Sequence, residues 1–151
     1  MKVWLLYLGL IALLLGCDDD FESLAIQDDA SVLSLNGTWR LVAYEDYRQN
    51  EIITKTEENS WGRDVVITFD DTTDPFGING QNTTNSVFGS FDYTERRSIR
   101  VPALGSTYVN QPEWGNLFNR LMRDELTFQI NTSYLKIYNE AQGLAALLEK
   151  Q

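Results

Sequence analysis

Residues 76–93 read FGINGQNTTNSVFGSFDY, and the rest of the folded chain can be arranged around this stretch. Its first part indicates a strand that ends in a turn of glycine and asparagine. A polar loop follows this turn. Glycine and asparagine accept the positive φ that tight turns need. Val87, Gly89, Phe91 and Tyr93 then follow at every second position, so one face of this run can meet a core. The stretch therefore predicts a β-hairpin.

Further strands are expected on both sides of this hairpin. The same reasoning predicts strands at residues 35–44, 64–69, 98–102, 126–130 and 134–138, and a loose hairpin or loop at 47–61 with a short strand near 51–56. Pro102 closes one of these segments, which is typical of an edge strand. The stretch from Asp70 to Pro75 is rich in turn formers and breaks the strand before it.

One helix is predicted, at residues 112–123. Pro112 suits a first helical turn, and an apolar stripe follows at helical spacing, formed by Trp114, Leu117, Phe118, Leu121 and Met122. A core-facing helix explains this stripe better than a helix on a membrane surface. The tail is ambiguous, because residues 144–150 are helix formers while Gln142 and Gly143 mark a turn.

Composition limits the classes of function. The 151 residues suffice for one core and one domain, and the net charge of −10 disfavours nucleic acid and anionic membrane surfaces as partners. We expect a monomer. The chain has no histidine, and its single cysteine is Cys17, so it has neither the usual general base near neutral pH nor an intramolecular disulfide.

The first 16 residues are interpreted as a lipoprotein signal peptide. Lys2 precedes an apolar run of 13 residues that ends in Leu-Leu-Gly before Cys17. Such a run is too short for about 30 Å of hydrocarbon, which disfavours the alternative of a transmembrane helix; a short buried helix is the other alternative. The four residues up to Cys17 resemble a bacterial lipobox, which implies cleavage before Cys17 and acylation of its thiol. We expect a bacterial envelope protein that is lipid-anchored to the outer membrane.

Asp18, Asp19 and Asp20 follow at once. This cluster resembles the surface-export signal of Bacteroidota lipoproteins, whereas an aspartate directly after the cysteine resembles the inner-membrane retention signal of enterobacteria. A solvated spacer is the third interpretation. Residues 17–34 as a whole are interpreted as a lipidated acidic tether, with a short helical turn as the alternative for part of it.

Residues 35–151 resemble the META domain family, the HslJ-like heat-inducible lipoproteins. The resemblance lies in the opening Asn-Gly-Thr-Trp, in Gly-rich segments of the hairpin and in the final strand pair. The motif residues are Gly37, Trp39, Gly77, Gly80, Asn82 and Gly89. Two cysteines common in the family are absent, because this chain has Gln81 before Asn82 and Gln111 before Pro112. No thiol chemistry is therefore implied.

The resemblance implies a mainly β fold: an antiparallel curled sheet or partly open barrel of about seven or eight strands, of lipocalin-like topology, with one amphipathic helix packed against it. It also implies that residues 144–149 form a strand, against their propensity. The large apolar side chains of such a small barrel are expected to fill its interior.

No catalytic pattern stands out in the sequence. There is no Gly-x-Ser-x-Gly segment and no phosphate-binding glycine loop, and Asp70, Asp71 and Asp74 do not follow the calcium loop of EF-hands. We expect no enzyme, no cofactor and no metal. The first hypothesis is a non-catalytic envelope lipoprotein that binds a partner protein or supports the envelope under stress. The alternative is a lipocalin-like carrier of a small apolar ligand.

Overall fold

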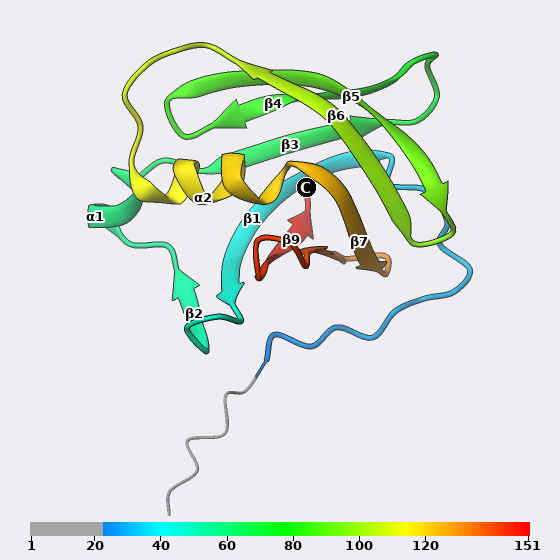
Figure 1. Ribbon diagram of the computed structural model, residues 1–151, viewed down its shortest axis with the longest axis horizontal. Helices are drawn as coiled ribbons and strands as arrows, with labels where there is room; N and C mark the ends of the chain where they lie inside the picture. Colours follow the sequence, from blue (N-terminus) through cyan, green and yellow to red (C-terminus); the bar gives the residue numbers. More distant parts are fainter. Residues whose placement is uncertain (1–22) are drawn as a thin grey trace, which may run out of the picture.

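The computed structural model describes residues 23–151 (Figure 1). The expected signal peptide, the lipid attachment residue Cys17 and the sorting signal Asp18, Asp19 and Asp20 lie outside the described residues and stay predictions. Within residues 23–151, no helix combines the length and the apolar character needed to cross a bilayer.

In this part of the chain, nine antiparallel strands form one continuous sheet. They are β1 (Gly37–Asp46), β2 (Glu51–Thr54), β3 (Val65–Asp70), β4 (Phe76–Asn82), β5 (Asn85–Glu95), β6 (Ser98–Ser106), β7 (Asp124–Ile130), β8 (Tyr134–Asn139) and β9 (Leu144–Lys150). β1 pairs with β3 and with β9, which closes an up-and-down barrel of eight strands, while β2 lies beside the second half of β1. The mainly β fold is confirmed, and the barrel is closed because its last strand reaches its first.

The hairpin predicted at residues 76–93 is formed by β4 and β5. Its turn differs from the prediction, because β4 continues through Gly77 and Gly80 to Asn82. The chain reverses instead at Thr83 and Thr84, and Thr83 takes the positive φ of 50°. Gly77 and Gly80 are therefore strand residues and not turn residues, and Gly80 allows the close approach of β3.

The tail forms strand β9, as the family resemblance implies and against its helix propensity. β9 pairs with β8 on one side and with β1 on the other. Leu144, Ala145, Ala146 and Leu148 are completely buried there. Pairing on both edges together with this burial outweighs an intrinsic preference that amounts to a few tenths of a kcal/mol per residue.

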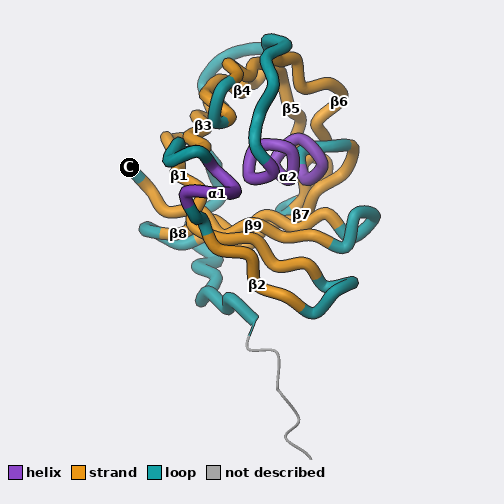
Figure 2. The backbone as a smooth tube through the Cα atoms, turned by 90° about the vertical axis from the view of Figure 1, so that its left-hand side faces the viewer, coloured by secondary structure: helices purple, strands orange, loops and turns teal. Residues whose placement is uncertain are grey.

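Within residues 23–151, two helices accompany the barrel. The predicted helix is α2 (Glu113–Leu121), whose buried residues include Trp114, Leu117 and Phe118. The sequence did not indicate α1 (Glu57–Ser60), a single turn. α1 begins with a capping box, in which the Thr56 hydroxyl accepts from the Asn59 N–H at 3.1 Å and the Asn59 side chain accepts from the Thr56 N–H at 2.8 Å. Figure 2 shows α2 among the strands, with α1 beside it.

The barrel interior is filled by large side chains. Those expected to fill it, Trp39, Phe69, Phe91, Trp114 and Phe118, are each at most 1% exposed and belong to one apolar cluster. Tyr44 connects β1 with α2, because its ring lies edge-on to that of Trp114 at 4.8 Å and its hydroxyl donates to the Trp114 carbonyl at 2.7 Å. The helix is thereby fixed inside the ring of strands.

Residues 23–34, called the strap here, lie against the barrel and lead into β1 (Figure 1). Asp28 accepts the N–H of Ile130 and forms an ion pair of 3.1 Å with Arg97. The Asp29 N–H donates to the Ile130 carbonyl, and Arg97 donates to the carbonyls of Asp29 and Val32. The described part of the expected tether is thus attached to the barrel along its length.

Candidate binding site

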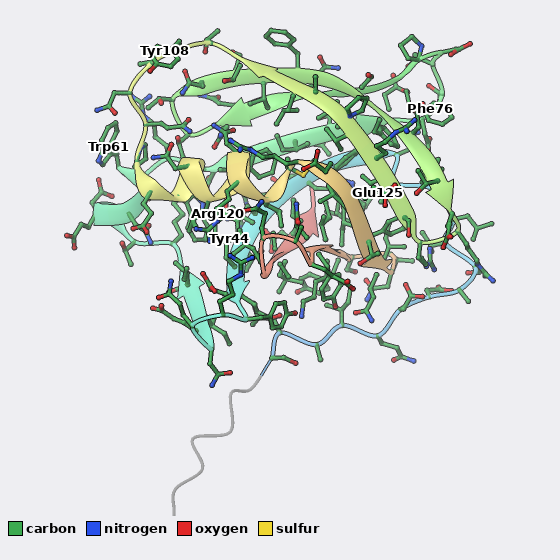
Figure 3. All side chains as sticks on the ribbon, in the orientation of Figure 1. Tyr44, Trp61, Phe76, Tyr108, Arg120 and Glu125 are labelled. Atoms are coloured by element: carbon green, nitrogen blue, oxygen red, sulfur yellow. The ribbon has the colours of Figure 1, made fainter. Side chains whose placement is uncertain are left out.

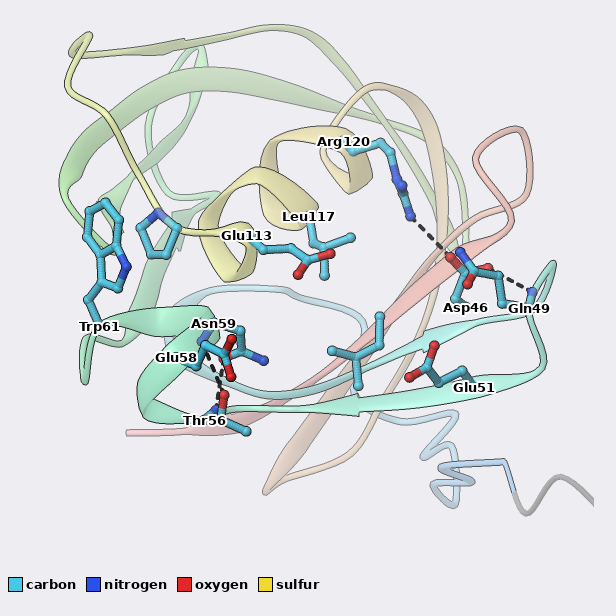
Figure 4. Close-up of a pocket in the computed structure, with 12 residues that line it drawn as sticks. Asp46, Gln49, Glu51, Thr56, Glu58, Asn59, Trp61, Glu113, Leu117 and Arg120 are labelled. Atoms are coloured by element: carbon cyan, nitrogen blue, oxygen red, sulfur yellow. Dashed lines mark hydrogen bonds and ion pairs between the residues drawn. The ribbon is translucent and has the colours of Figure 1, made fainter.

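A pocket of about 650 Å³ lies where α1, α2, β2 and the turn after β1 meet. Figure 4 shows Trp61 at one end of this space and Asp46 and Gln49 at the other. Its volume is within the range of small-ligand sites, roughly 300–1,000 Å³. The pocket opens to solvent and is separate from the filled interior of the barrel.

α2 and β2 each present one face to the pocket. Glu113, Leu117 and Arg120 of α2 are four and three positions apart, so they share one face of the helix. Glu51 and Ile53 of β2 are two positions apart and share one face of the strand. Figure 4 shows the three α2 side chains extending toward β2.

Trp61, directly after α1, is the large exposed aromatic residue of this pocket. Its side chain is 47% exposed, and its backbone is left-handed, with a φ of 54°. That conformation is uncommon for a bulky residue and is typically retained at functional sites and turns. Its N–H donates to the Glu57 carbonyl at 2.8 Å, which ends the helix and places Trp61 directly after it.

The charged groups of the pocket are predominantly acidic. The pocket is lined by one guanidinium, that of Arg120, and by the four carboxylates Asp46, Glu51, Glu58 and Glu113. Arg120 lies 3.3 Å from Asp46, whose other oxygen accepts backbone N–H groups of the following turn. Within residues 23–151, the other three carboxylates have no ion-pair partner. A cleft lined by one sign of charge attracts ligands of the opposite sign.

β1 contains a β-bulge before two adjacent carboxylates, Glu45 and Asp46. The pairing of β1 with β9 shifts between Leu41 and Ala43. After this bulge, Asp46 faces Arg120 and the pocket, while its neighbour Glu45 meets Lys136 of β8 beneath the strap. The two adjacent carboxylates therefore serve opposite faces of one strand.

Glu45 and Lys136 form a buried ion pair under the strap. Their side chains are 0% and 3% exposed and lie 2.7 Å apart. The backbone of Leu24 completes the pair, because its N–H donates to Glu45 and its carbonyl accepts from Lys136 at 2.8 Å. Tyr47 donates to Glu45 at 2.5 Å, and the Lys136 ammonium lies 5.1 Å from the centre of the Tyr138 ring.

The surroundings of this ion pair shift the pKa of the Glu45 carboxyl and that of the neighbouring Tyr138 hydroxyl. Burial raises the pKa of the Glu45 carboxyl, but hydrogen bonds from Lys136 and Tyr47 outweigh burial and bring that pKa below its ordinary value. Burial and the Glu45 charge raise the pKa of Tyr138 to about 12. The Glu45 carboxyl is thus ionised at neutral pH, and the Tyr138 hydroxyl keeps its proton.

The six motif residues named from the sequence are part of the scaffold and do not line the pocket. Trp39 is buried and donates its indole N–H to the Leu35 carbonyl at 2.9 Å. Asn82 donates to the Gly115 carbonyl and to Asn119, which fixes α2 to β4.

The glycines of the motif lie in the sheet. Gly37 has a φ of 138° at the start of β1, and Gly77 lies in β4 without a close neighbour at its Cβ position. Cβ atoms added at Gly80 and Gly89 would overlap backbone carbonyl oxygens of β3 and β6. Conformation thus explains Gly37, and close strand approach explains Gly80 and Gly89, whereas neither explains Gly77.

Sequence reasoning did not find the pocket residues. They come from α1, α2, β2 and the turn after β1, and no local pattern unites them. One signal is visible afterwards, namely a tryptophan in an otherwise polar and charged segment beside Glu57 and Glu58. In the described part of the chain, no group of three or more acidic, cysteine or histidine side chains is arranged to hold a metal ion.

Two solved structures resemble this protein in fold. No protein-family model and no curated protein matches the sequence. An NMR structure of a protein from Burkholderia xenovorans superimposes with a TM-score of 0.61 at 15% identity, over 86% of this chain and 95% of that chain. A crystal structure of a DUF4847 family protein from Bacteroides vulgatus gives 0.53 at 16% identity, over 80% and 97%. At such identities the likeness shows the barrel fold alone.

Proposed function

We propose that this protein is a non-enzymatic binding protein of the bacterial envelope, held there by a lipid on Cys17. The pocket between α1, α2 and β2 binds a positively charged segment of a partner protein. The observation that carries this proposal is the combination of three unpaired carboxylates with the exposed indole of Trp61 around one space.

The pocket chemistry suits a lysine or arginine side chain. Glu58 and Glu113 offer carboxylates from two helices, and an ammonium or guanidinium group gains further from the face of an indole ring. Ile53 and Leu117 supply apolar surface for the methylene stem of such a side chain.

The envelope location is supported by the sequence. The lone cysteine stands in a lipobox-like segment, and the resemblance of residues 35–151 to META domain lipoproteins agrees with a small anchored β domain. A binding role agrees with the absence of histidine from the whole chain.

A second candidate function is carriage of a small apolar ligand, as in lipocalin-like barrels. The closed up-and-down barrel and the solved structures of similar fold are compatible with it. The filled interior favours the first candidate, because Phe69, Phe91 and Phe118 occupy the space that an interior ligand would need.

Binding of a fluorescently labelled lysine- and arginine-rich peptide, followed by anisotropy, tests the proposal. We expect the double variant Glu58→Gln, Glu113→Gln to weaken binding about tenfold, because two carboxylates at the pocket are lost. The matched control is Glu95→Gln, Glu140→Gln, which removes the same charge from exposed positions outside the pocket. Equal losses of peptide affinity in both variants would indicate general charge attraction and contradict a binding site at this pocket. Binding of a neutral apolar probe without binding of the peptide would favour the carrier function.

A further inference from the structure

Strand β6 has a free edge over part of its length. It pairs with β5 as far as Ser106, but β7 accompanies it only at residues 98–101. Residues 102–106 therefore have a strand on one side only. Pro102, which the sequence marks as an edge residue, stands where the second neighbour ends.

The phase of the pairing shows which backbone groups are free. The Thr107 N–H donates to the Ser86 carbonyl at 3.1 Å, so this opposed pair is a hydrogen-bonded one. Since the groups of an antiparallel strand alternate, Ala103 and Gly105 point toward β5, and Leu104 and Ser106 point away from it. No strand of residues 23–151 lies opposite their N–H and carbonyl groups.

A groove runs along this edge. Leu104 and Ser106 form one wall, and Asn119, Met122 and Arg123 at the end of α2 form the other, around about 310 Å³. The groove continues through Ser106 and Asn119 into a second space of about 350 Å³ under the loop that carries Tyr108. Figure 3 shows Tyr108 on this loop between β6 and α2, and its side chain is fully exposed.

We propose that this groove is a strand-addition site for an extended peptide that carries an acidic residue. The free N–H and carbonyl groups of Leu104 and Ser106 recur every two residues, about 7 Å along the strand, which is the repeat of an extended peptide backbone. A carbohydrate has no such repeat of alternating donors and acceptors.

The charge of the groove indicates the acidic residue. Arg123 is the one charged side chain that lines either space. Its Nε donates to the Asn119 carbonyl at 3.1 Å, and its two terminal nitrogens have no partner within residues 23–151. A guanidinium fixed in this way presents a fork to a carboxylate. The site is independent of the pocket at Trp61, which attracts the opposite charge.

The edge also lacks the protection that natural sheets give to free strands. Charged side chains commonly block such edges. Residues 103–106 are Ala-Leu-Gly-Ser and carry no charge, whereas the short outer strand β2 carries Glu51. An incoming strand therefore meets no charged side chain at residues 103–106 of β6.

Amide hydrogen exchange of the full chain in detergent micelles tests the proposal. The probe is a pool of short peptides in which valine and threonine alternate around one glutamate. At a tenfold excess over the dissociation constant, we expect exchange at Leu104 and Ser106 to slow about tenfold, with Ala103 and Gly105 unchanged, because only the first two gain partners. Absence of this protection at millimolar peptide would overturn the proposal, as would protection by a soluble oligosaccharide in place of the peptide.

Variants at two positions separate backbone pairing from side-chain binding. Ser106→Pro removes an N–H that the barrel does not use and is expected to abolish protection of Leu104, whereas the matched control Ser106→Ala retains it. Arg123→Gln, an exposed change with no effect expected on folding, should weaken peptide binding several-fold. Unchanged binding in both Ser106→Pro and Arg123→Gln would contradict the proposed site.

Discussion

Two glycines of β4 have different surroundings. A Cβ at Gly80 would overlap the Val66 carbonyl oxygen and lie 2.9 Å from the Ile67 Cα, whereas a Cβ at Gly77 would meet nothing nearer than 3.6 Å. We expect Gly80→Ala to lower the free energy of unfolding by about 1–3 kcal/mol, because β3 and β4 must move apart.

Urea unfolding of both alanine variants checks this prediction. Gly77→Ala is the matched control in the same strand, and its free energy of unfolding should change by less than about 0.5 kcal/mol. Equal stability of the two variants would show that β3 can shift without loss, and that Gly80 is not required for close strand approach.

The buried pair of Glu45 and Lys136 supports a second prediction. Either single change, Glu45→Met or Lys136→Met, should lower the free energy of unfolding by about 3–5 kcal/mol, because it leaves one buried charge without its partner. The double change should recover most of that loss, since no charge then remains. A double-mutant cycle measured by denaturant unfolding reports the coupling, and additive losses would contradict it.

Individual residues were predictable from the sequence where their role is local or periodic. Trp39 and the stripe of α2 lie in the core, as their spacing indicates. The partner of Glu45 was not predictable, because Lys136 lies 91 positions further along the chain and alternates with apolar neighbours like an ordinary surface lysine. The same holds for Trp61 and Glu113, which line one pocket only because the fold brings their segments together.

Among the elements, the strap is expected to respond to acid. The Glu45 carboxyl has a lowered pKa in the folded state, so its stabilising contribution is complete above the unfolded value of about 4.5 and is lost as the pH falls through the folded value. The groups that face it are Lys136 and Tyr138 of β8, Tyr47 after β1, and the Leu24 backbone.

Thermal unfolding between pH 7 and pH 3 measures this response. We expect the unfolding temperature to fall below about pH 4.5, and the exchange of the Asp29 amide to speed up in the same range as the strap loosens. In the Glu45→Met, Lys136→Met variant this pH dependence should be smaller. An identical pH profile in that variant would place the acid response elsewhere.

The elements themselves show where sequence patterns suffice. Sequence patterns located eight of the strands, including the short β2, and the family resemblance supplied β9 where propensity favoured a helix. Alternation missed the exact turn of the β4–β5 hairpin, since glycine served strand packing there. It also missed α1, because one helical turn held by a capping box is too short to show a period.

For the molecule as a whole, the anchoring proposal makes the fourth prediction. Cys17→Ser should shift the protein from the membrane fraction to the soluble fraction or leave it uncleaved, because the only thiol that can be acylated is lost. Fractionation together with labelling by a fatty-acid analogue measures this outcome. Acyl labelling that persists in the variant would exclude Cys17 as the attachment residue.

Attachment of the strap at Leu24 determines how far such an anchored domain reaches. Only residues 18–23 lie between Cys17 and the residue that binds Glu45 and Lys136. Fully extended, they cover about 25 Å, whereas a tether that stayed free up to the start of β1 would cover nearly three times as much. In an acylated form, Leu24 would therefore stay within about 25 Å of the anchored thiol, and the barrel would remain next to the lipid headgroups.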